Sequence, residues 1–262
     1  MANPDPKRVL LTGDVHGNTE WAVRHVLKTA RRKKAQLILQ VGDMGVWPGT
    51  RGKRFLDQVD HESGLARIPW HFIDGNHEDF DQLLAYPVGD DGRRIVRQHI
   101  FHLPRGFRWS WAGRSFVALG GAGSIDRDSR LPGHSWWPQE TITDDDVREC
   151  IRGGSVDVLI AHDAPVNLHI KSDWGKPPED ILLDLEASRG RLQQVVDACQ
   201  PKLVVHGHWH FGQRSQVQRA NGGSYEVVSL AADGQVGGHC ALLDLVALRF
   251  SPDPSSAVSV ID

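Results

Sequence analysis

The sequence has few cysteines and no segment suited to crossing a membrane. Among its 262 residues the three cysteines, Cys150, Cys199 and Cys240, lie far apart. Because no C-x-x-C pair occurs, neither a zinc ribbon nor a disulfide framework is predicted. There is no run of about 18 apolar residues, and the first residues, MANPDPKRVLLTGD, lack the apolar segment of a signal peptide. We expect a cytoplasmic protein without a membrane partner.

Positive charge is not in excess either. The lysines and arginines number 30 against 33 aspartates and glutamates, which gives a formal net charge of −3. This balance argues against binding of extended duplex nucleic acid, but it is compatible with a small nucleotide. No linker or internal repeat divides the chain, so we predict one domain over residues 1–262 with a loosely held tail at about 251–262. The sequence leaves the oligomeric state open.

Short apolar runs recur along the chain, and each ends in glycine and polar residues. The runs are RVLLTGDVHG, QLILQVGD, WHFIDGNHE, RSFVALGGAG, DVLIAHDAP and KLVVHGHWH. Each is typical of a buried strand of about five residues. After Gly222 the segments SYEVVSLAADG and CALLDLVALRF follow with no helix between them, which predicts antiparallel strands late in the chain.

Helical patterns alternate with the early strands. After GDVHGN, four apolar residues fall on one helical face, with Asn18 or Thr19 as N-cap: Val23, Val26, Leu27 and Ala30. ITDDDVRECIRGG predicts a second helix with Thr143 as N-cap and Asp146 in a near capping box. RLQQVVDACQP predicts a third, stopped by Pro201. The alternation indicates an α/β fold with parallel strands in its first half and a mixed sheet or two sheets overall.

The predicted strand ends deliver side chains of the kind that bind metals. In α/β folds ligands bind at the carboxyl ends of strands. Carboxylate, imidazole and amide oxygen are ligands that Mn²⁺, Fe and Zn²⁺ accept. Each short motif alone is common in turns and caps, but five strand ends that all carry such groups predict a metal site. The residues are Asp14, His16, Asp43, Asn76, His77, His162, His208 and His210.

The ordered motifs GDVHGN, VGDMG, GNHE, the lone His162 and GHWH resemble the calcineurin-like metallophosphoesterases over residues 13–210. The resemblance implies a four-layer α/β/β/α sandwich with two mixed sheets and two metal ions at the carboxyl edge of the strands. It implies a first metal held by Asp14, His16 and His210, a second held by Asn76, His162 and His208, and Asp43 as the bridge. Mn²⁺ is the metal we expect, with Fe, Zn²⁺ and Ni²⁺ as alternatives.

The implied chemistry is hydrolysis of a phosphoric ester. Two cations about 3.5–4 Å apart would bind a bridging hydroxide, which attacks phosphorus. Asp43 and His77 would be the catalytic residues. His77 would face the substrate phosphate and either protonate the leaving oxygen or stabilise the phosphoryl oxygens. We expect Glu78 either to orient His77 or to lie at the surface, and His206 to pack or to support a ligand.

The substrate class is less sharply defined. Ser/Thr protein phosphatases continue their second motif as GD-x-x-DRG, whereas here MGVWPG follows Asp43, and GHWH resembles phosphodiesterase members. We predict a phosphodiesterase for small diesters, with 2′,3′-cyclic nucleotides as one candidate. The alternatives are a phosphomonoesterase, including one of the protein phosphatase type, and a nucleotide pyrophosphohydrolase. A catalytically inactive binding module is a remote alternative, because such a module would have lost ligands.

Arginine and tryptophan near the motifs are candidates for contact with substrate. Arginine suits phosphate, and tryptophan suits a nucleobase. A loop between the third and fourth ligand strands, GGAGSIDRDSRLPGHSWWPQE, supplies four of them, and its tryptophans are also suited to packing the loop onto the body. The candidates are Arg127, Arg130, Trp136, Trp137, Trp209 and Trp47.

Overall fold

The computed structural model of the chain describes residues 5–170, 175, 177–219, 222–235, 237–251 and 258–260. Within them, the strands form two seven-stranded mixed sheets. The first sheet has the order β13 (Arg249–Phe250), β12 (Cys240–Asp244), β1 (Arg8–Thr12), β2 (Leu37–Gln40), β3 (Trp70–Phe72), β5 (Ile100–His102) and β4 (Arg94–Ile95). The second has the order β14 (Val258–Val260), β10 (Gln213–Gln218), β11 (Ser224–Ser229), β9 (Leu203–His206), β8 (Val158–Ala161), β7 (Arg114–Leu119) and β6 (Arg108–Trp111).

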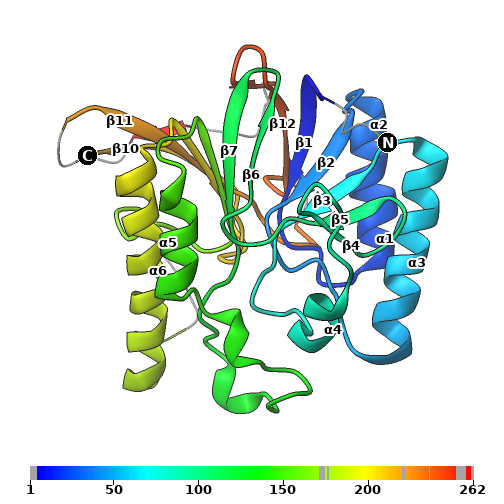
Figure 1. The fold of residues 1–262 in the computed structure, drawn as a ribbon, viewed down its shortest axis with the longest axis horizontal. Coiled ribbons are helices and arrows are strands. Elements are labelled where there is room, and N and C mark those ends of the chain that lie inside the picture. Colours follow the sequence, from blue (N-terminus) through cyan, green and yellow to red (C-terminus); the bar gives the residue numbers. More distant parts are fainter. Residues whose placement is uncertain are drawn as a thin grey trace.

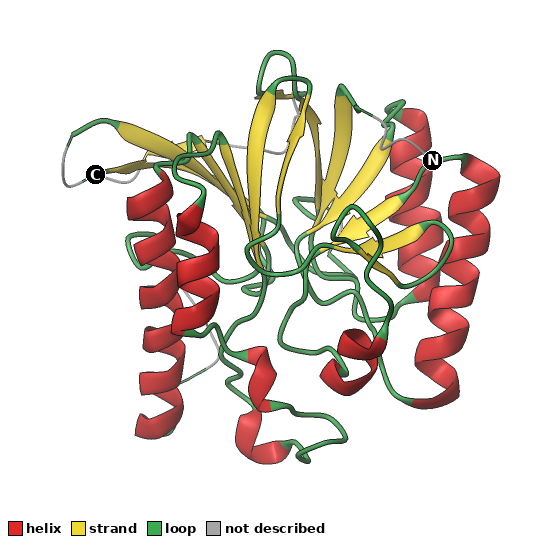
Figure 2. Ribbon diagram, viewed as in Figure 1, coloured by secondary structure: helices red, strands yellow, loops and turns green. Residues whose placement is uncertain are grey.

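Helices cover the outer face of each sheet, which gives the four layers seen in Figures 1 and 2. On the side of the first sheet lie α1 (Thr19–Trp21), the π-helical turn Ala22–Leu27, α2 (Lys28–Arg32) and α3 (Gly49–Ala66). On the side of the second sheet lie α5 (Asp144–Arg152) and α6 (Glu179–Cys199). The short α4 (Phe80–Ala85) and the 3₁₀ turns Arg127–Ser129 and Pro138–Glu140 lie in the loops near the strand ends.

Three apolar cores separate the four layers, because successive strand residues point to opposite faces. In β1, Leu10 belongs to the core under the helices of the first sheet, whereas Val9 and Leu11 belong to the core between the sheets. In β8, Ile160 faces the inter-sheet core and Leu159 faces the helices of the second sheet. Both faces of each sheet are therefore buried, which explains why the strands read as continuous apolar runs.

The fold confirms the predicted four-layer α/β/β/α sandwich. The side chain of Asn18 caps the first helix by accepting the N–H of Trp21, and Thr143 and Asp146 form the predicted capping box of α5. The two late segments enter different sheets: β11 pairs antiparallel with β10, and β12 pairs antiparallel with β1.

Part of the predicted tail is described as backbone only. Residues 258–260 form β14, which runs parallel to β10, and residues 252–257, 261 and 262 lie outside the described part of the chain. No helix in the described part is long and apolar enough to cross a membrane.

Candidate metal centre

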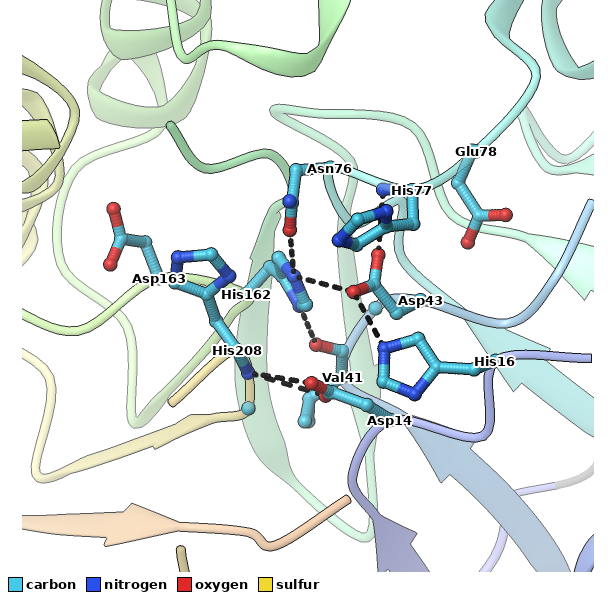
Figure 3. A network of polar contacts seen from close by, with 12 residues as sticks. Asp14, His16, Val41, Asp43, Asn76, His77, Glu78, His162, Asp163 and His208 are labelled. Atoms are coloured by element: carbon cyan, nitrogen blue, oxygen red, sulfur yellow. Dashed lines mark hydrogen bonds and ion pairs between the residues drawn. The ribbon is translucent and has the colours of Figure 1, made fainter. Parts of the chain in front are cut away.

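The site lies where the carboxyl ends of both sheets meet. Parallel strands β1, β2 and β3 of the first sheet lead to Asp14, Asp43 and Asn76, and parallel strands β8 and β9 of the second lead to His162 and His208. Figure 3 shows these side chains converging from loops that are far apart in sequence. The chain turns sharply at four of the positions, because the φ angles of four non-glycine residues are positive: His16 (48°), Asp43 (49°), His208 (65°) and His210 (58°).

One group of side chains gathers around the loop after β1. The Oδ2 atom of Asp14 lies 3.1 Å from Nε2 of His210, and Nε2 of His16 lies 3.3 Å from Oδ2 of Asp43. The ligand-type atoms of Asp14, His16 and His210 lie within 4.8 Å of one another, a spacing that one metal ion could span. These three are the residues expected at the first metal.

A second group gathers around His162, which is completely buried. Its Nε2 lies 3.0 Å from Oδ1 of Asn76 and 3.5 Å from Oδ2 of Asp43, and its ring centroid lies 5.1 Å from that of His208. The Nδ2 of Asn76 donates to Ser124, so Oδ1 is the atom that faces the imidazole. If the imidazole is neutral, its Nε2 and the amide oxygen at this distance direct lone pairs at each other and repel. A proton or a metal cation between the two atoms removes this repulsion.

Asp43 joins the two groups. Its side chain is 1% exposed, and Oδ1 accepts the backbone N–H of His77 at 2.9 Å. Oδ2 faces His16 and His162 but accepts no hydrogen bond, which is costly for a buried carboxylate oxygen and is the position a bridging metal ligand requires. Burial opposes ionisation, but the imidazoles of His162 and His77 outweigh it and lower the pKa of Asp43 well below its ordinary value.

The imidazoles of His16 and His162 lie in a strongly negative potential. Burial opposes their charged form, yet the hydrogen bond to Asp233 and the nearby carboxylate of Asp43 raise the pKa of His16 to about 11. The charge of Asp43 raises the pKa of His162 to about 10 against the same opposition. A field that favours a proton on imidazole also favours a divalent cation at the same place. The donor set, the unsatisfied Asp43 oxygen and this field together fit metal binding.

The sequence matches the family profile described as calcineurin-like phosphoesterase across residues 7–212. The chain belongs to this family. Its members are dinuclear metal-dependent hydrolases of phosphoric esters, so the predicted family and reaction class are confirmed. No curated protein sequence matches the chain.

Solved structures resemble the chain only distantly. A Mycoplasma pneumoniae protein described as a novel phosphatase is 11% identical, with 96% of this chain and 92% of that chain covered and a TM-score of 0.47. A hypothetical protein from Thermus thermophilus is 15% identical, covers 87% and 76%, and has a TM-score of 0.42. A predicted phosphoesterase from Streptococcus pneumoniae is 9% identical, covers 92% and 84%, and has a TM-score of 0.34. All three TM-scores lie below 0.5, so nothing about activity follows from them.

Glu78 of this calcineurin-like phosphoesterase neither orients His77 nor lies at the surface. It is completely buried, and its carboxylate accepts the backbone N–H groups of Met44, Gly45 and Val46 at 2.7, 3.2 and 2.8 Å. Figure 3 shows its carboxylate turned away from the His77 ring. Burial and the nearby Asp43 raise the pKa of Glu78 to about 8, against the effect of the three donors. Glu78 therefore holds the loop that follows Asp43.

The backbone of His77 is instead fixed from both sides. Its N–H donates to Oδ1 of Asp43, and its carbonyl accepts the indole N–H of Trp47 at 3.0 Å. Trp47 is thus a support of the His77 loop as well as a neighbour of the site. Burial lowers the pKa of His77, and the charge of Arg130 adds to this while Asp43 opposes it. The neutral imidazole is favoured, with one N–H available as a donor.

His206 ends β9 and is completely buried. The Oγ of Ser229 lies 2.7 Å from its Nε2, and Nδ1 lies 2.9 Å from the carbonyl oxygen of Gly207. Burial lowers its pKa to about 4. These contacts tie β9 to β11 just before the GHWH motif, which is the packing role expected of it.

The two arginines of the loop after β7 are already paired. Arg127 forms ion pairs with Asp180 and Asp184 of α6. Arg130 is only 8% exposed and donates to Oγ of Ser124, to Glu140 and to the backbone carbonyl of Asn76. Arg127 therefore anchors the loop to α6, and Arg130 supports the Asn76 loop from behind.

The tryptophans of the same loop are also occupied. Trp137 is 5% exposed, packs in the core of the first sheet and donates its indole N–H to Asp81 at 2.9 Å. Trp136 donates to Glu140 at 2.8 Å. Trp209 lies beside His208, with ring centroids 5.4 Å apart, and its indole N–H donates to Asp163. The contacts of the loop tryptophans favour the packing alternative, whereas Trp47 and Trp209 flank the ligand loops.

Proposed function

We propose that the chain is a dinuclear phosphodiesterase that hydrolyses small phosphodiesters, with 2′,3′-cyclic nucleotides as the candidate natural class. Asp14, His16 and His210 would hold one ion, Asn76, His162 and His208 the other, and Asp43 would contact both. Oxygen and imidazole ligands suit Mn²⁺, which is the metal we propose. The observation that carries the proposal is the buried Oδ2 of Asp43, which lies between His16 and His162 without a hydrogen bond.

Two bound divalent ions would supply charge for the phosphoryl group and a lowered pKa for attacking water. The protein's own contribution is orientation. Both peptide groups of His77 are fixed by hydrogen bonds, and its ring centroid lies 5.8 Å from that of His16. The neutral form of His77 can donate one N–H to a phosphoryl or leaving-group oxygen. We propose that the imidazolium form of His77 assists the reaction by transferring its proton to the leaving oxygen, a step that leaves the ring neutral.

The small number of unpaired arginines near the site supports a substrate with one negative charge, as in a diester. A phosphomonoester carries a charge of about −1.5 to −2 at neutral pH, whereas a diester carries one negative charge. The arginine of the protein phosphatase motif is missing after Asp43, and both Arg127 and Arg130 are engaged with carboxylates. Fewer free guanidinium groups are therefore at hand to bind a dianion.

The substrate class is tested on Mn²⁺-loaded protein with matched aryl esters. We expect kcat/KM for bis(4-nitrophenyl) phosphate to exceed that for 4-nitrophenyl phosphate by at least about tenfold, and 2′,3′-cyclic AMP to be hydrolysed; a tenfold ratio corresponds to about 1.4 kcal/mol. Faster hydrolysis of the monoester, or efficient release of phosphate from a phosphoserine peptide, would refute the diester proposal and favour the monoesterase alternative.

The role of His77 is tested by its alanine variant on two leaving groups. Nitrophenolate departs without a proton, whereas a nucleoside alkoxide needs one. His77→Ala should keep both metal ions, slow the nucleotide diester by about 10²–10⁴-fold and slow the nitrophenyl diester clearly less. Equal slowing of both substrates would contradict proton donation, and loss of a metal would make His77 a ligand.

A further inference from the structure

Asp233 lies in the turn after β11, and the sequence motifs give no indication of its position. Its Oδ1 lies 2.9 Å from Nδ1 of His16, a residue 217 positions earlier in the chain. Its Oδ2 accepts from Nδ2 of Asn18 at 2.8 Å, and its backbone N–H donates to the carbonyl oxygen of Asp14 at 2.8 Å. Both carboxylate oxygens and the backbone N–H of Asp233 thus contact the loop that carries the proposed ligands of the first metal.

The contact with Asp233 determines how the His16 ring presents itself. A carboxylate can only accept, so the nitrogen beside it, Nδ1, carries the hydrogen. In the neutral imidazole the lone pair is then on Nε2, the atom that faces Oδ2 of Asp43 at 3.3 Å. A carboxylate behind a ligating histidine fixes both its tautomer and its ring direction, and it makes the ligand more basic.

Asn18 fixes the carboxylate in turn. Its Oδ1 accepts the N–H of Trp21 at 3.1 Å as the N-cap of α1, so the amide cannot be turned over without loss of the cap. The Nδ2 group must therefore point toward Asp233 and needs an acceptor there. An amide at position 233 could satisfy His16 or Asn18 but not both, because its NH₂ group would meet a second donor.

We propose that Asp233 is a positioning residue for the first metal ion, acting through His16. The proposal rests on the dinuclear site proposed above. The effect should be confined to one metal, because His162 is oriented differently: its Nδ1 donates to the backbone carbonyl of Val41 at 2.7 Å. A mutation of Asp233 leaves that contact intact.

The test measures affinity for Mn²⁺ rather than activity. Metal-free protein is titrated with Mn²⁺ by calorimetry, and the parent should bind two ions. Asp233→Asn should weaken one site by about 10–100-fold and leave the other within about twofold. Asp233→Glu, which keeps the charge, should recover part of the loss. A circular dichroism spectrum and melting temperature of the metal-free variant separate this effect from misfolding.

Asp128→Asn is the matched control. It removes the same charge from a carboxylate that is 61% exposed and pairs with Arg127, so both affinities should stay unchanged. If Asp128→Asn lowers the Mn²⁺ affinity as much as Asp233→Asn does, the effect comes from the change in net charge alone. That result would overturn the proposal. Unchanged affinities in Asp233→Asn, or equal loss at both sites, would overturn it as well.

Two double variants, each with one metal site disabled, identify which site Asp233 affects. With His208→Ala, in which the second site is disabled, Asp233→Asn should still weaken the ion that remains. With His210→Ala, in which the first site is disabled, it should have no further effect, and the reverse pattern would overturn the proposal. The parent's failure to cleave diesters would refute only the proposed activity, since the affinity difference decides the role of Asp233 separately. A parent that binds no Mn²⁺ would refute both.

Discussion

A methyl group added at Gly75 would test how tightly the ligand loops are packed without removing any ligand. Gly75 stands between β3 and Asn76, and a Cβ there would lie 2.0 Å from Oδ1 of Asp43 and 2.4 Å from its backbone nitrogen. The φ angle of Gly75 is not among the positive ones, so its backbone conformation is open to alanine. The three atoms nearest to that Cβ all belong to Asp43, and contact with Asp43 therefore excludes a side chain.

The size of the effect follows from these distances. Ordinary contact begins at 3.4 Å, so the Gly75→Ala methyl and the Asp43 carboxylate must separate by about 1.4 Å. Asp43 is buried and its Oδ1 accepts a hydrogen bond from the N–H of His77, so any shift moves the proposed bridging ligand and the His77 loop together. Misplacement by about 1 Å costs about 10²-fold in rate. We expect kcat/KM to fall at least that far, both metals to bind more weakly, and about 1–3 kcal/mol of stability to be lost through overpacking.

The assay compares kcat/KM for a diester, bound metal per chain and melting temperature with those of Gly190→Ala. Gly190 lies within α6 and has open space around its Cβ position, so this substitution should leave activity unchanged and add about 0.5–1 kcal/mol of stability. Parental activity and two bound metals in Gly75→Ala would refute the claim that this glycine is required by the bridging aspartate. An unfolded Gly75→Ala would show instead that the contact limits folding.

Three further predictions concern single side chains. Asp43→Asn should abolish nearly all activity and weaken both metals, as measured by metal content, because one carboxylate serves both groups; full turnover would exclude the shared bridge. Trp137→Ala should lower the free energy of unfolding, measured with urea, by about 3–5 kcal/mol, because the buried ring and its hydrogen bond to Asp81 are lost. Unchanged stability with a raised KM for a nucleotide would instead support stacking of Trp137 on the substrate. Burial and the charge of Arg93 lower the pKa of His71 to about 3. Below about pH 6.5 the imidazole of His71 is therefore protonated in the unfolded chain but stays neutral in the folded chain. Stability is then lost as the pH falls toward 3, by about 2 kcal/mol between pH 7 and 5, and His71→Gln should remove that share of the loss.

The residues at the strand ends were predictable because polar and ionisable side chains follow each apolar run within a few positions of the sequence. RVLLT and QLILQ are apolar runs, and an aspartate follows each of them after one or two intervening residues. Parallel strands in one sheet bring such residues to one edge, whatever happens in the connections. The convergence of Asp14, Asp43 and Asn76 thus follows from local sequence and a topological rule.

The 18-residue helix α3 was not identified, although it is the longest element on its side of the molecule. Its buried residues include Phe55, Leu56 and Val59, a helical face too narrow to stand out among charged neighbours. Glycines also lower its helix propensity. One of them is needed for packing, since a Cβ at Gly52 would lie 2.0 Å from the backbone oxygen of Trp47. Tertiary contact outweighs the local signal here.

The supporting contacts of the site were also beyond the sequence. Nothing near Glu78 indicates that it serves the loop after Asp43, and only the fold brings Asp233 to His16. Arg130 was expected to bind phosphate because of its nearness to the ligand motifs. Its actual partners, including the carbonyl oxygen of Asn76, come from loop closure. Residue type predicted which side chains gather at the site, whereas the partners of each side chain depend on long-range packing.

The motif glycines carry information that their usual interpretation as turn residues leaves out. Gly42 has a φ of +105° and so does turn the chain, but a Cβ there would also lie 2.1 Å from Nδ1 of His162. A Cβ at Gly207 would lie 2.2 Å from Oδ1 of Asp14, and neither Gly207 nor Gly75 has a positive φ. Each of these glycines stands immediately before a predicted ligand, but the predicted ligand that it makes room for follows another strand. In G-D, G-N and G-H the glycine is therefore needed because predicted ligands from different strands pack closely against it. This close packing explains why three short motifs far apart in the sequence can specify one site.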